Sequence, residues 1–444
     1  MSLTIPITWR DPVTAFAPFA GEPWAMLLDS AAADDAAASP RARYAFLAAR
    51  PRTTLLDPAE PFAALAEALG PRRSFSHGTP LPFAGGAVGL FGYELGRHLE
   101  RAPRRHAGAA GEMAVGIYDV VAGFDLAEQK AWVVASDASA RGKAERLAAE
   151  LETAPVLAAP SSAPPVEIHP ELERADYIER VARVIDYIGA GDIFQANFTQ
   201  RFIAERPDGY SAFDLYRRLR ALNPAPFAAF LNCGEDLSVV TASPERFLRL
   251  DRLGQIEARP IKGTRRRAAD PAEDARAAAE LAASVKDRAE NLMITDLLRN
   301  DIGRVAELGS VTVSALQAVE SYATLHHLVS VVEARLRPGL GPVELLRATF
   351  PGGSITGAPK VRAMEIIDEL EPAPRGPYCG AIGWIGFDGA MDTSIVIRSV
   401  SLTRERIVAQ AGGAIVADSD PEGEYAEMMA KVAPALAAIG GRAA

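Results

Sequence analysis

Short β-forming runs separated by turns, with little helical sequence between them, make up the first third of the chain. These apolar and aromatic runs lie at residues 24–28, 44–47, 86–91 and 131–134. A helical run follows only at residues 139–151. A sheet must cover its apolar face with another layer of structure, and this region has few helices of its own. We therefore expect the first third to form one compact body with the rest of the chain.

A run rich in Pro, Ala and Ser at residues 154–165 interrupts this pattern and offers little to bury. Such a composition is typical of a linker. We therefore expect an N-terminal region at 1–153, a linker at 154–168 and a larger C-terminal region at 169–440.

The charge balance and the apolar pattern exclude some classes of function. Acidic residues outnumber basic ones, 57 against 47, and the net charge of -10 disfavours a partner with a phosphate backbone. Apolar runs end well before the ~20 residues needed to cross a bilayer, and the N-terminus lacks a signal-peptide pattern. Cys233 and Cys379 are too few for a disulfide framework. We expect a cytoplasmic protein with reduced thiols that contacts neither nucleic acid nor membrane.

A lysine stands between a proline and a glycine in Arg259-Pro-Ile-Lys262-Gly-Thr264, at the end of a strand-like run. Proline fixes φ ahead of Lys262, and glycine removes the side chain that would follow it. The amine therefore sits on a stiff and uncrowded turn. It is either a nucleophile or an ordinary surface cation, and the general exposure of lysines favours the surface cation.

Local capping signals predict where three helices begin. Ser211 is an expected cap, and an acid followed by proline at Asp270-Pro271 and at Asp420-Pro421 favours a helix start.

Two pairs of acidic residues share one spacing on expected helices. Asp287 and Glu290 are three residues apart, as are Glu424 and Glu427 after Asp420-Pro421. Residues three apart lie on the same helix face, where like charges repel weakly. Taken alone, each pair is more typical of a solvated helix face than of a metal site.

Further polar residues alternate along a strand-like run or fall at a turn. Gln195, Asn197 and Thr199 share one strand face, and Phe194 and Phe198 lie on or near the other. We therefore expect a polar face beside a buried one. Glu245 falls at a turn between two strands.

The glycine-rich stretch 350–360 leads into an expected helix at 361–370, so its amides are suited to holding an anion at the helix N-terminus. Downstream, Asp388-Gly389 is a strong hairpin signal between expected strands at 378–387 and 391–402. The second strand carries Arg398, and a buried strand arginine usually faces a carboxylate that it binds with two hydrogen bonds.

A series of short motifs runs in order through the C-terminal two thirds. They are Ser243-Pro-Glu245-Arg-Phe, Pro260-Ile-Lys262-Gly-Thr, Glu290-Asn-Leu-Met, Arg299-Asn-Asp-Ile-Gly-Arg304, His327-Leu-Val-Ser, Gly357-Ala-Pro-Lys360, Asp392-Thr-Ser-Ile-Val-Ile-Arg398 and Glu424-Tyr-Ala-Glu427. Together they resemble the chorismate-utilising enzymes and cover nearly all of residues 170–435. The resemblance implies an α/β (α+β) fold like that of anthranilate synthase component I, a sandwich of large, mostly antiparallel sheets with flanking helices. It also implies that 169–440 is the chorismate-binding catalytic domain.

Two positions separate the branches of this family. Members that form isochorismate or salicylate carry a water-activating lysine where this chain has Gln195, and anthranilate-forming members carry alanine where it has Lys262. The resemblance therefore implies amination of chorismate to 4-amino-4-deoxychorismate, on the route to 4-aminobenzoate and folate. Formation of anthranilate, or less favourably of isochorismate, is the alternative. A non-catalytic sensor of chorismate or tryptophan, using the N-terminal sheet near Leu27-Leu-Asp29-Ser30, is an alternative of another class.

The resemblance implies a role for each matching residue. Lys262 adds to C2 of chorismate as the C4 oxygen departs, Glu245 protonates that oxygen, and His327 orients the C4 region. Lys262 must then be neutral, and Glu245 needs a raised pKa in an enclosed site. The residues implied in substrate binding are Gln195, Thr264, Thr356, Lys360, Tyr378 and Arg398 (the last two for the enolpyruvyl carboxylate), with Gly412 and Gly413 for the ring carboxylate.

Magnesium is the implied cofactor, with Glu290 and Glu427 as ligands and Asp287 and Glu424 acting through water. Asp287 stands where glutamate is usual, so its side chain is shorter by one methylene. The amine donor must come from elsewhere, because the chain has no Gly-x-Cys-x-Gly nucleophile turn. The resemblance implies a separate glutamine amidotransferase (glutaminase) subunit that delivers ammonia, and ammonium salts should replace it.

Overall fold

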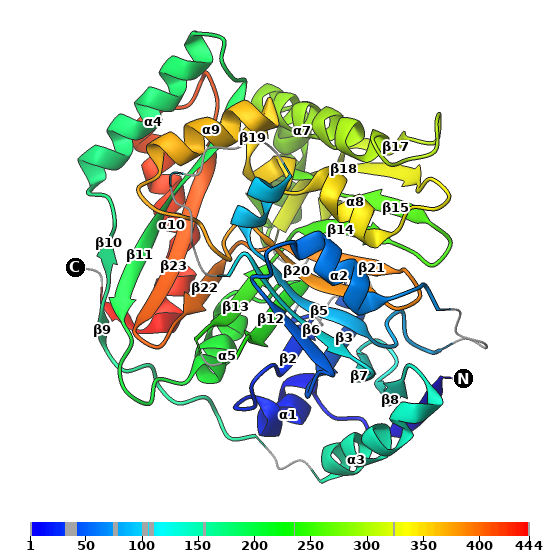
Figure 1. Cartoon of the computed structure of the whole chain (residues 1–444). Helices are drawn as coiled ribbons and strands as arrows, with labels where there is room; N and C mark the ends of the chain where they lie inside the picture. The colour runs from blue at the N-terminus through cyan, green and yellow to red at the C-terminus, as the bar shows by residue number, and fades with distance from the viewer. Residues whose placement is uncertain are drawn as a thin grey trace.

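Two large sheets lie against each other in a sandwich, and helices cover their outer faces (Figure 1). The computed structural model describes residues 2–31, 42–73, 79–99, 105, 111–153, 157–234, 236–322 and 325–442. Within these residues, the strands of both sheets pair in antiparallel fashion. The sandwich of antiparallel sheets implied by the family resemblance is confirmed.

The strands and helices have the following bounds. The first sheet runs β1 (Leu3–Ile7), β8 (Lys130–Ala135), β7 (Val120–Asp125), β3 (Tyr44–Ala48), β2 (Met26–Asp29), β12 (Phe227–Asn232), β13 (Ser238–Ser243), β22 (Ser399–Leu402), β23 (Arg406–Ile415), β11 (Gln195–Glu205) and β10 (His169–Pro170), with β19 (Gly357–Ala358) also on β11. The second runs β16 (Ile261–Arg266), β18 (Leu325–Arg335), β15 (Gln255–Ala258), β14 (Arg246–Leu250), β21 (Met391–Ile395), β20 (Ala381–Gly386), β5 (Gly86–Phe91), β6 (Met113–Tyr118) and β4 (Thr53–Leu56), with β17 (Thr312–Ser321) also on β18. The α-helices are α1 (Pro12–Phe16), α2 (Pro61–Leu69), α3 (Arg141–Glu152), α4 (Arg174–Gly189), α5 (Ala212–Leu222), α6 (Pro271–Ala283), α7 (Val285–Gly303), α8 (Pro342–Thr349), α9 (Lys360–Leu370) and α10 (Pro421–Ile439).

The N-terminal region contributes strands to both sheets. In the first sheet β2 pairs with β12, and in the second β5 pairs with β20. Residues from both sheets form one apolar cluster between them, including Met26 and Trp384. The N-terminal strands are therefore covered by the opposite sheet, which explains why so little helix is needed there. The expected linker range contains β9 (Val166–Glu167), which pairs with β24 (Gly441–Arg442) beyond α10; residues 154–156 lie outside the described residues.

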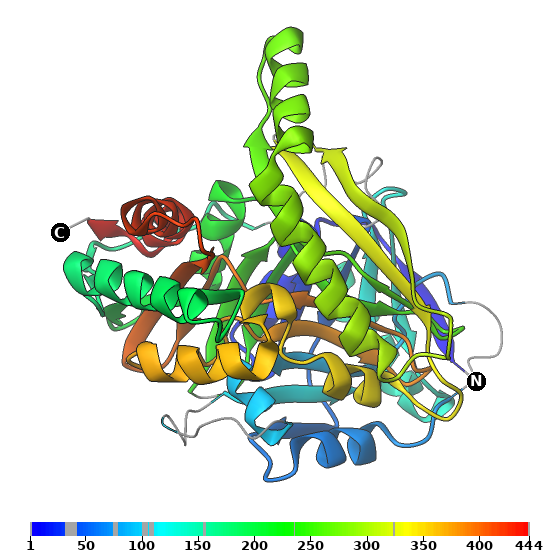
Figure 2. The same cartoon turned by 90° about the horizontal axis from the view of Figure 1, so that it is seen from above.

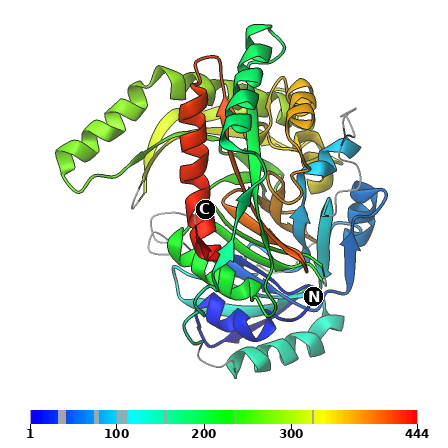
Figure 3. The same ribbon diagram turned by 90° about the vertical axis from the view of Figure 1, so that its left-hand side faces the viewer.

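Helices α4, α5, α9 and α10 pack on the first sheet, while α7 and α8 pack on the second. Figure 3 shows α10 and α4 side by side, and the two helices are in contact. Figure 2 shows α6 extending away from the body of the molecule beside the ends of β17 and β18. Within the described part of the chain, no helix is both long and apolar enough to span a membrane.

Capping side chains lie at the starts of three helices, at the positions expected from the sequence. The Ser211 side chain accepts a hydrogen bond from the backbone N–H of Asp214 at 3.1 Å and caps α5. Asp270 caps α6 by accepting from the N–H groups of Ala272 and Glu273. Asp420 caps α10 in the same way. These three helix starts are confirmed.

The expected strand at 391–402 is wrong as a single element. Its first half, β21, belongs to the second sheet, and its second half, β22, belongs to the first. The chain crosses between the sheets at 396–398, where Arg398 has a φ of 54° in the left-handed region. Arg398 is therefore on a crossover and not on a strand. Alternation of apolar residues is the same in both sheets, so it does not reveal a crossover.

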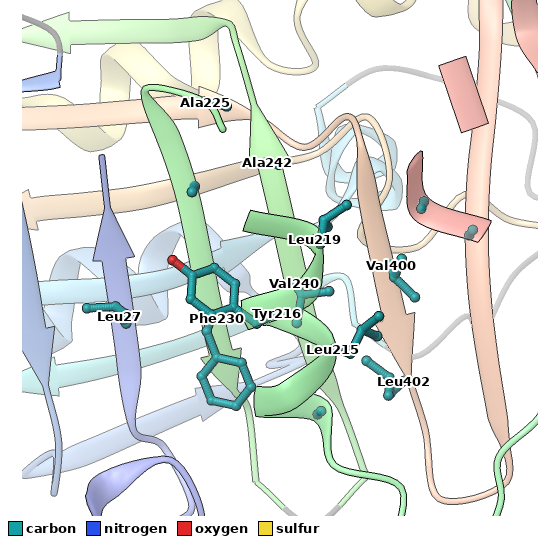
Figure 4. Close-up of a cluster of buried hydrophobic side chains, with 14 of the residues drawn as sticks. Leu27, Leu215, Tyr216, Leu219, Ala225, Phe230, Val240, Ala242, Val400 and Leu402 are labelled. Carbon is teal, nitrogen blue, oxygen red and sulfur yellow. The ribbon is translucent and has the colours of Figure 1, made fainter. Parts of the chain in front are cut away.

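One apolar cluster of the core joins α5 to the first sheet (Figure 4). Tyr216 and Leu219 of α5 lie over Phe230 of β12 and Val240 of β13, and all four are buried. The ring of Phe230 also lies 5.6 Å from that of Phe16, centroid to centroid. Phe230 thus links the helix layer to the junction between the N-terminal and C-terminal strands.

Replacing Phe230 with alanine should test this junction. The Phe230→Ala variant is expected to lower the free energy of unfolding by about 3–5 kcal/mol, because the lost apolar contacts leave a cavity in the core. Urea unfolding followed by circular dichroism measures the change. Leu253, which is 79% exposed, provides the control variant Leu253→Ala. A loss for Phe230→Ala as small as that of the control would contradict the packing described.

Candidate active site

Lys262 lies on β16, an edge strand of the second sheet that α7 packs against. Its amine is 3.7 Å from Oε2 of Glu290 on α7, and its side chain is only 12% exposed. Burial lowers the pKa of Lys262, although Glu290, Glu245 and Glu427 oppose that shift. A low-dielectric environment penalises the charged form of an amine. Lys262 is therefore not a surface cation, and its amine is shifted toward the neutral, nucleophilic form.

Glu245 connects β13 to β14 and is buried. Burial raises the pKa of Glu245 to about 7, and a hydrogen bond with the Ser354 side chain and the charge of Lys262 oppose the rise. Ser354 belongs to the glycine-rich stretch between α8 and α9. A carboxyl group with a pKa near 7 holds its proton in part of the population at neutral pH and is suited to act as a general acid.

The first turns of α10 bring further charges to the same place. Glu427 contacts Lys431, one turn later, at 2.5 Å from Oε1 to Nζ. Burial raises the pKa of Glu427, but Lys431, Lys286 and Lys262 outweigh burial, so the pKa is lowered overall. Glu424 instead accepts a hydrogen bond from the Ser419 hydroxyl at 2.6 Å, and burial raises its pKa.

Gly412 and Gly413 on β23 face this group of charges and the neighbouring strand. A Cβ at Gly412 would lie 2.0 Å from the carbonyl oxygen of Phe198, so only glycine allows the two strands to approach this closely. A Cβ at Gly413 would lie 3.0 Å from Oε2 of Glu424 and 3.5 Å from Nζ of Lys431. The missing side chain at Gly413 therefore leaves space beside the charged ends of α10.

Tyr378 and Arg398 come together where the chain crosses between the sheets. The Arg398 guanidinium donates from Nη1 to the carbonyl of Lys431 at 2.9 Å, and burial lowers its pKa. Burial also raises the pKa of Tyr378 well above its usual value, with the nearby charge of Arg398 acting against that rise. The carboxylate that sequence reasoning expected opposite Arg398 is replaced here by a backbone carbonyl, which leaves most of the five guanidinium N–H donors for other acceptors.

His327 and Gln195 lie on different sheets. His327 on β18 pairs with β16, and its Nδ1 is 3.0 Å from the hydroxyl of Thr264. Gln195 begins β11 and is fully buried, and neither atom of its side-chain amide has a hydrogen-bond partner among the described residues. A buried amide without partners is costly, so Gln195 is suited to receive a polar ligand.

The expected division of β11 into a polar and a buried face is partly wrong. Asn197 and Thr199 are buried, like Phe198. Phe194, expected on or near the buried face, precedes the strand and is 70% exposed. The polar face is enclosed because the segment after α9 covers it: the Thr199 hydroxyl donates to Glu371 at 2.9 Å, and the Asn197 amide lies 4.0 Å from Sγ of Cys379.

Three candidate residues are bound to partners that do not belong to the group of charges around Lys262. Lys360 is held by Asp301, 2.6 Å from Nζ to Oδ2, and by the carbonyl of Thr349. The Thr356 hydroxyl donates to the carbonyl of Gly352 at 2.9 Å. Asp287 accepts a hydrogen bond from the Arg265 guanidinium at 3.1 Å.

Two carboxylates fit a magnesium ion. Among the described residues, no three His, Cys, Asp or Glu side chains form a preassembled metal site. However, the negative charges of Glu290 on α7 and Glu427 on α10 both oppose the lowering of the Lys262 pKa. The two carboxylates therefore approach the same amine from separate helices. Mg²⁺ commonly binds one or two protein carboxylates and completes its shell with water and substrate oxygens. Glu290 and Glu427 therefore fit the donor set, whereas Asp287 is paired with Arg265.

Lys431 and Ser354 are among the residues of this group that sequence reasoning missed. Lys431 stands four residues after Glu427, a spacing that places both on one helix face and that was visible in the sequence. Ser354 had no such signal, because its contact with Glu245 joins residues more than a hundred positions apart.

A separate cavity of about 990 Å³ opens beside β2, β12, β14, β20 and β21. Its lining includes Asp29 and Ser30, but none of the charged residues around Lys262. Asp29 accepts hydrogen bonds from the Tyr216 hydroxyl at 2.7 Å and from Nε of Arg220 at 2.6 Å. The Ser30 hydroxyl donates to the carbonyl of Tyr44 at 2.9 Å, so both polar residues of the Leu-Leu-Asp-Ser segment bind other parts of the chain.

Known proteins match this chain over most of its length. The sequence model of the chorismate binding enzyme family matches residues 24–437. Aminodeoxychorismate synthase component 1 of Klebsiella aerogenes is 44% identical over 96% of this chain and 97% of its own length. Anthranilate synthase component 1 of Streptomyces coelicolor is 39% identical over 96% of this chain and 86% of its own length.

The solved structure of anthranilate synthase component I from Streptococcus pneumoniae TIGR4 superposes with a TM-score of 0.76. It is 32% identical and covers 89% of this chain and 92% of its own. The family model and these relatives, which match nearly the whole chain, show that the chain belongs to the family of chorismate binding enzymes.

Proposed function

We propose that this chain aminates chorismate at C4 to give 4-amino-4-deoxychorismate, a step toward 4-aminobenzoate and folate, in the cytoplasm. The observation that carries the proposal is the buried Lys262 amine, shifted toward neutrality, within electrostatic reach of Glu245, whose pKa is raised to about 7. The relative named aminodeoxychorismate synthase component 1, at 44% identity, supports the same assignment.

The first step is an allylic displacement by Lys262. The neutral amine forms a bond to C2, the two ring double bonds shift, and the bond from C4 to its hydroxyl oxygen breaks. Glu245 donates its proton to that oxygen, so water leaves and the carboxylate remains. Hydroxide is a poor leaving group, and general acid catalysis of this kind contributes about 10²–10⁴-fold.

In the second step, ammonia displaces the lysine nitrogen from the adduct. Ammonia forms a bond to C4, the double bonds shift back, and the bond from C2 to the lysine nitrogen breaks. Lys262 leaves as the neutral amine, and the new ammonium group passes a proton to the Glu245 carboxylate. Two displacements restore the enzyme and allow the amine to occupy the stereochemical position of the hydroxyl.

The substrate carboxylates find cations and space in the same region. Arg398, beside Tyr378, has guanidinium donors available for the enolpyruvyl carboxylate. The amides near Gly412 and Gly413, together with the Lys431 ammonium, suit the ring carboxylate. His327, held by Thr264, is proposed to orient the C4 region.

Glu290 and Glu427 would hold Mg²⁺, which neutralises the ring carboxylate when bound. Both residues also act on the Lys262 amine. The same two carboxylates would therefore bind the metal and interact electrostatically with the nucleophilic amine.

The choice of ammonia over water is supported by Gln195. Its buried amide without partners provides hydrogen bonds but cannot act as a base that activates water. The name of the relative from Klebsiella aerogenes, component 1, implies a second component. We propose that this partner is a glutaminase that supplies ammonia to the site.

The product decides between the branches of the family. The chain, incubated with chorismate, Mg²⁺ and an ammonium salt, is expected to form 4-amino-4-deoxychorismate, identified by mass and chromatography. Glutamine alone is expected to give no product. Fluorescent anthranilate as the main product, or turnover to isochorismate without ammonium, would contradict the proposal.

Removal of the nucleophile tests the covalent route. The Lys262→Ala variant is expected to lower kcat by more than about 100-fold, because no side chain remains to form the adduct at C2. Initial rates at saturating chorismate and ammonium measure this effect. The matched control is Lys130→Ala, since Lys130 is exposed and its ammonium pairs with the surface residue Glu128 at 2.8 Å. Full activity of Lys262→Ala would rule out the covalent step.

The pH dependence tests the role of Glu245. The protonated carboxyl is the active acid and its pKa is raised to about 7, so kcat should fall as the pH rises through 7. Rates are compared at a constant concentration of free ammonia, because the fraction of free ammonia itself rises with pH. Glu245→Gln is expected to lower kcat by about 10²–10⁴-fold and to remove this descending limb. A limb that persists in the variant would assign the titration to another group.

A further inference from the structure

The backbone next to Lys262 contains a bulge. The register between β16 and β18 shifts between Lys262 and Thr264, and Gly263 has a φ of 76° in the left-handed region. A bulge of this kind interrupts the alternation of side chains and changes their direction. The direction of the Lys262 side chain therefore depends on the conformation at Gly263.

Asp287 packs directly against this bulge. A Cβ on Gly263 would lie 2.8 Å from Cγ of Asp287 and equally close to a methyl group of Leu281. Oδ2 of Asp287 accepts a hydrogen bond from Nη2 of Arg265 at 3.1 Å, and Nη1 of Arg265 donates to the carbonyl of Thr264 at 3.0 Å. One guanidinium thus joins the strand backbone after the bulge to the carboxylate on α7.

Asp287 is itself fixed at the start of α7. Its backbone N–H donates to the hydroxyl of Ser284, the N-cap residue, at 3.2 Å. Glu290, one turn later on the same helix face, has its carboxylate 3.7 Å from the Lys262 amine. The two acids of α7 therefore have different contacts. Glu290 lies beside the Lys262 amine, and Asp287 packs against the backbone at Gly263.

We propose that the ion pair between Asp287 and Arg265 is a positioning device for Lys262, and that Asp287 does not belong to the metal shell. The pair holds the Gly263 bulge against α7 and so fixes the direction of the nucleophilic amine. Its kinetic test rests on the proposed function, because the amine acts as a nucleophile only in that reaction.

The test compares Asp287→Asn, Arg265→Ala and the double variant. Each single variant is expected to lower kcat by about tenfold or more, because a small misplacement of a reacting group is costly. The double variant should be no slower than the slower single variant, since both changes break one pair. Arg265→Lys, which keeps the charge, should recover part of the loss, and KM for chorismate should change less than kcat.

Metal affinity separates this role from a role in the metal shell. MgCl₂ is titrated by calorimetry into the protein holding chorismate without ammonium, and Asp287→Asn is expected to bind Mg²⁺ as the unmodified protein does. An outer-shell metal residue would instead cost about 10–100-fold in affinity. Such a loss in Asp287→Asn but not in Arg265→Ala would overturn the proposal, as would unchanged kcat in both variants.

A neighbouring ion pair provides the matched control. Arg267 binds Asp274, and the side chains are 35% and 14% exposed, close to the 39% and 17% of Arg265 and Asp287. This pair joins the end of the same segment to α6 and does not touch Gly263. Arg267→Ala is therefore expected to leave kcat near that of the unmodified chain.

Hydrogen exchange tests the positioning role of the ion pair independently of the proposed catalytic function. Mass spectrometry of a peptide covering 261–266 is expected to show faster exchange in Arg265→Ala than in Arg267→Ala. This measurement needs no turnover. If the unmodified chain forms no aminated product, the proposed function fails, while equal exchange in the two variants would overturn the positioning role.

Discussion

The buried guanidinium of Arg375 holds together the parts of the chain on which the site is built. The guanidinium donates to both carboxylate oxygens of Glu371 and to the carbonyls of Asn197 and Ile355. The backbone N–H of Arg375 donates to Glu94 of the N-terminal region. One residue, through its side chain and its backbone N–H, thus joins β11, the glycine-rich stretch and the N-terminal region. Leaving one member of a buried ion pair without its partner costs about 3–5 kcal/mol, so this network strongly constrains how these segments meet.

The chemistry of the site follows from the burial of its ionisable groups. Burial shifts the pKa of Lys262 down and that of Glu245 up, because the amine is neutral when it has lost its proton and the carboxyl when it has kept it. The same desolvation therefore prepares a nucleophile and an acid. Carboxylates on α7 and α10 oppose the shift of Lys262, and a hydrogen bond from Ser354, in the stretch after α8, opposes that of Glu245. Only the sandwich brings these segments together.

The main errors of the sequence analysis concern contacts that a local pattern does not contain. The run 391–402 has a continuous strand pattern, yet it divides between two sheets at Arg398. Phe194 alternates correctly with its neighbours and is nevertheless exposed, because the strand begins one residue later. In each case the outcome depends on residues far away in the sequence.

The sequence by itself determined the features that arise from near neighbours: the helix starts at Ser211, Asp270 and Asp420, the β-rich first third, and the order of motifs that identifies the family and singles out Lys262. Short-range hydrogen bonds and backbone restrictions produce these features, so a linear pattern contains them. Only the tertiary structure decided that Lys262 is buried, that the Gln195 amide has no partner among the described residues and that Asp287 binds Arg265. Desolvation and pairing depend on which distant segments surround a group, and folding alone establishes that environment.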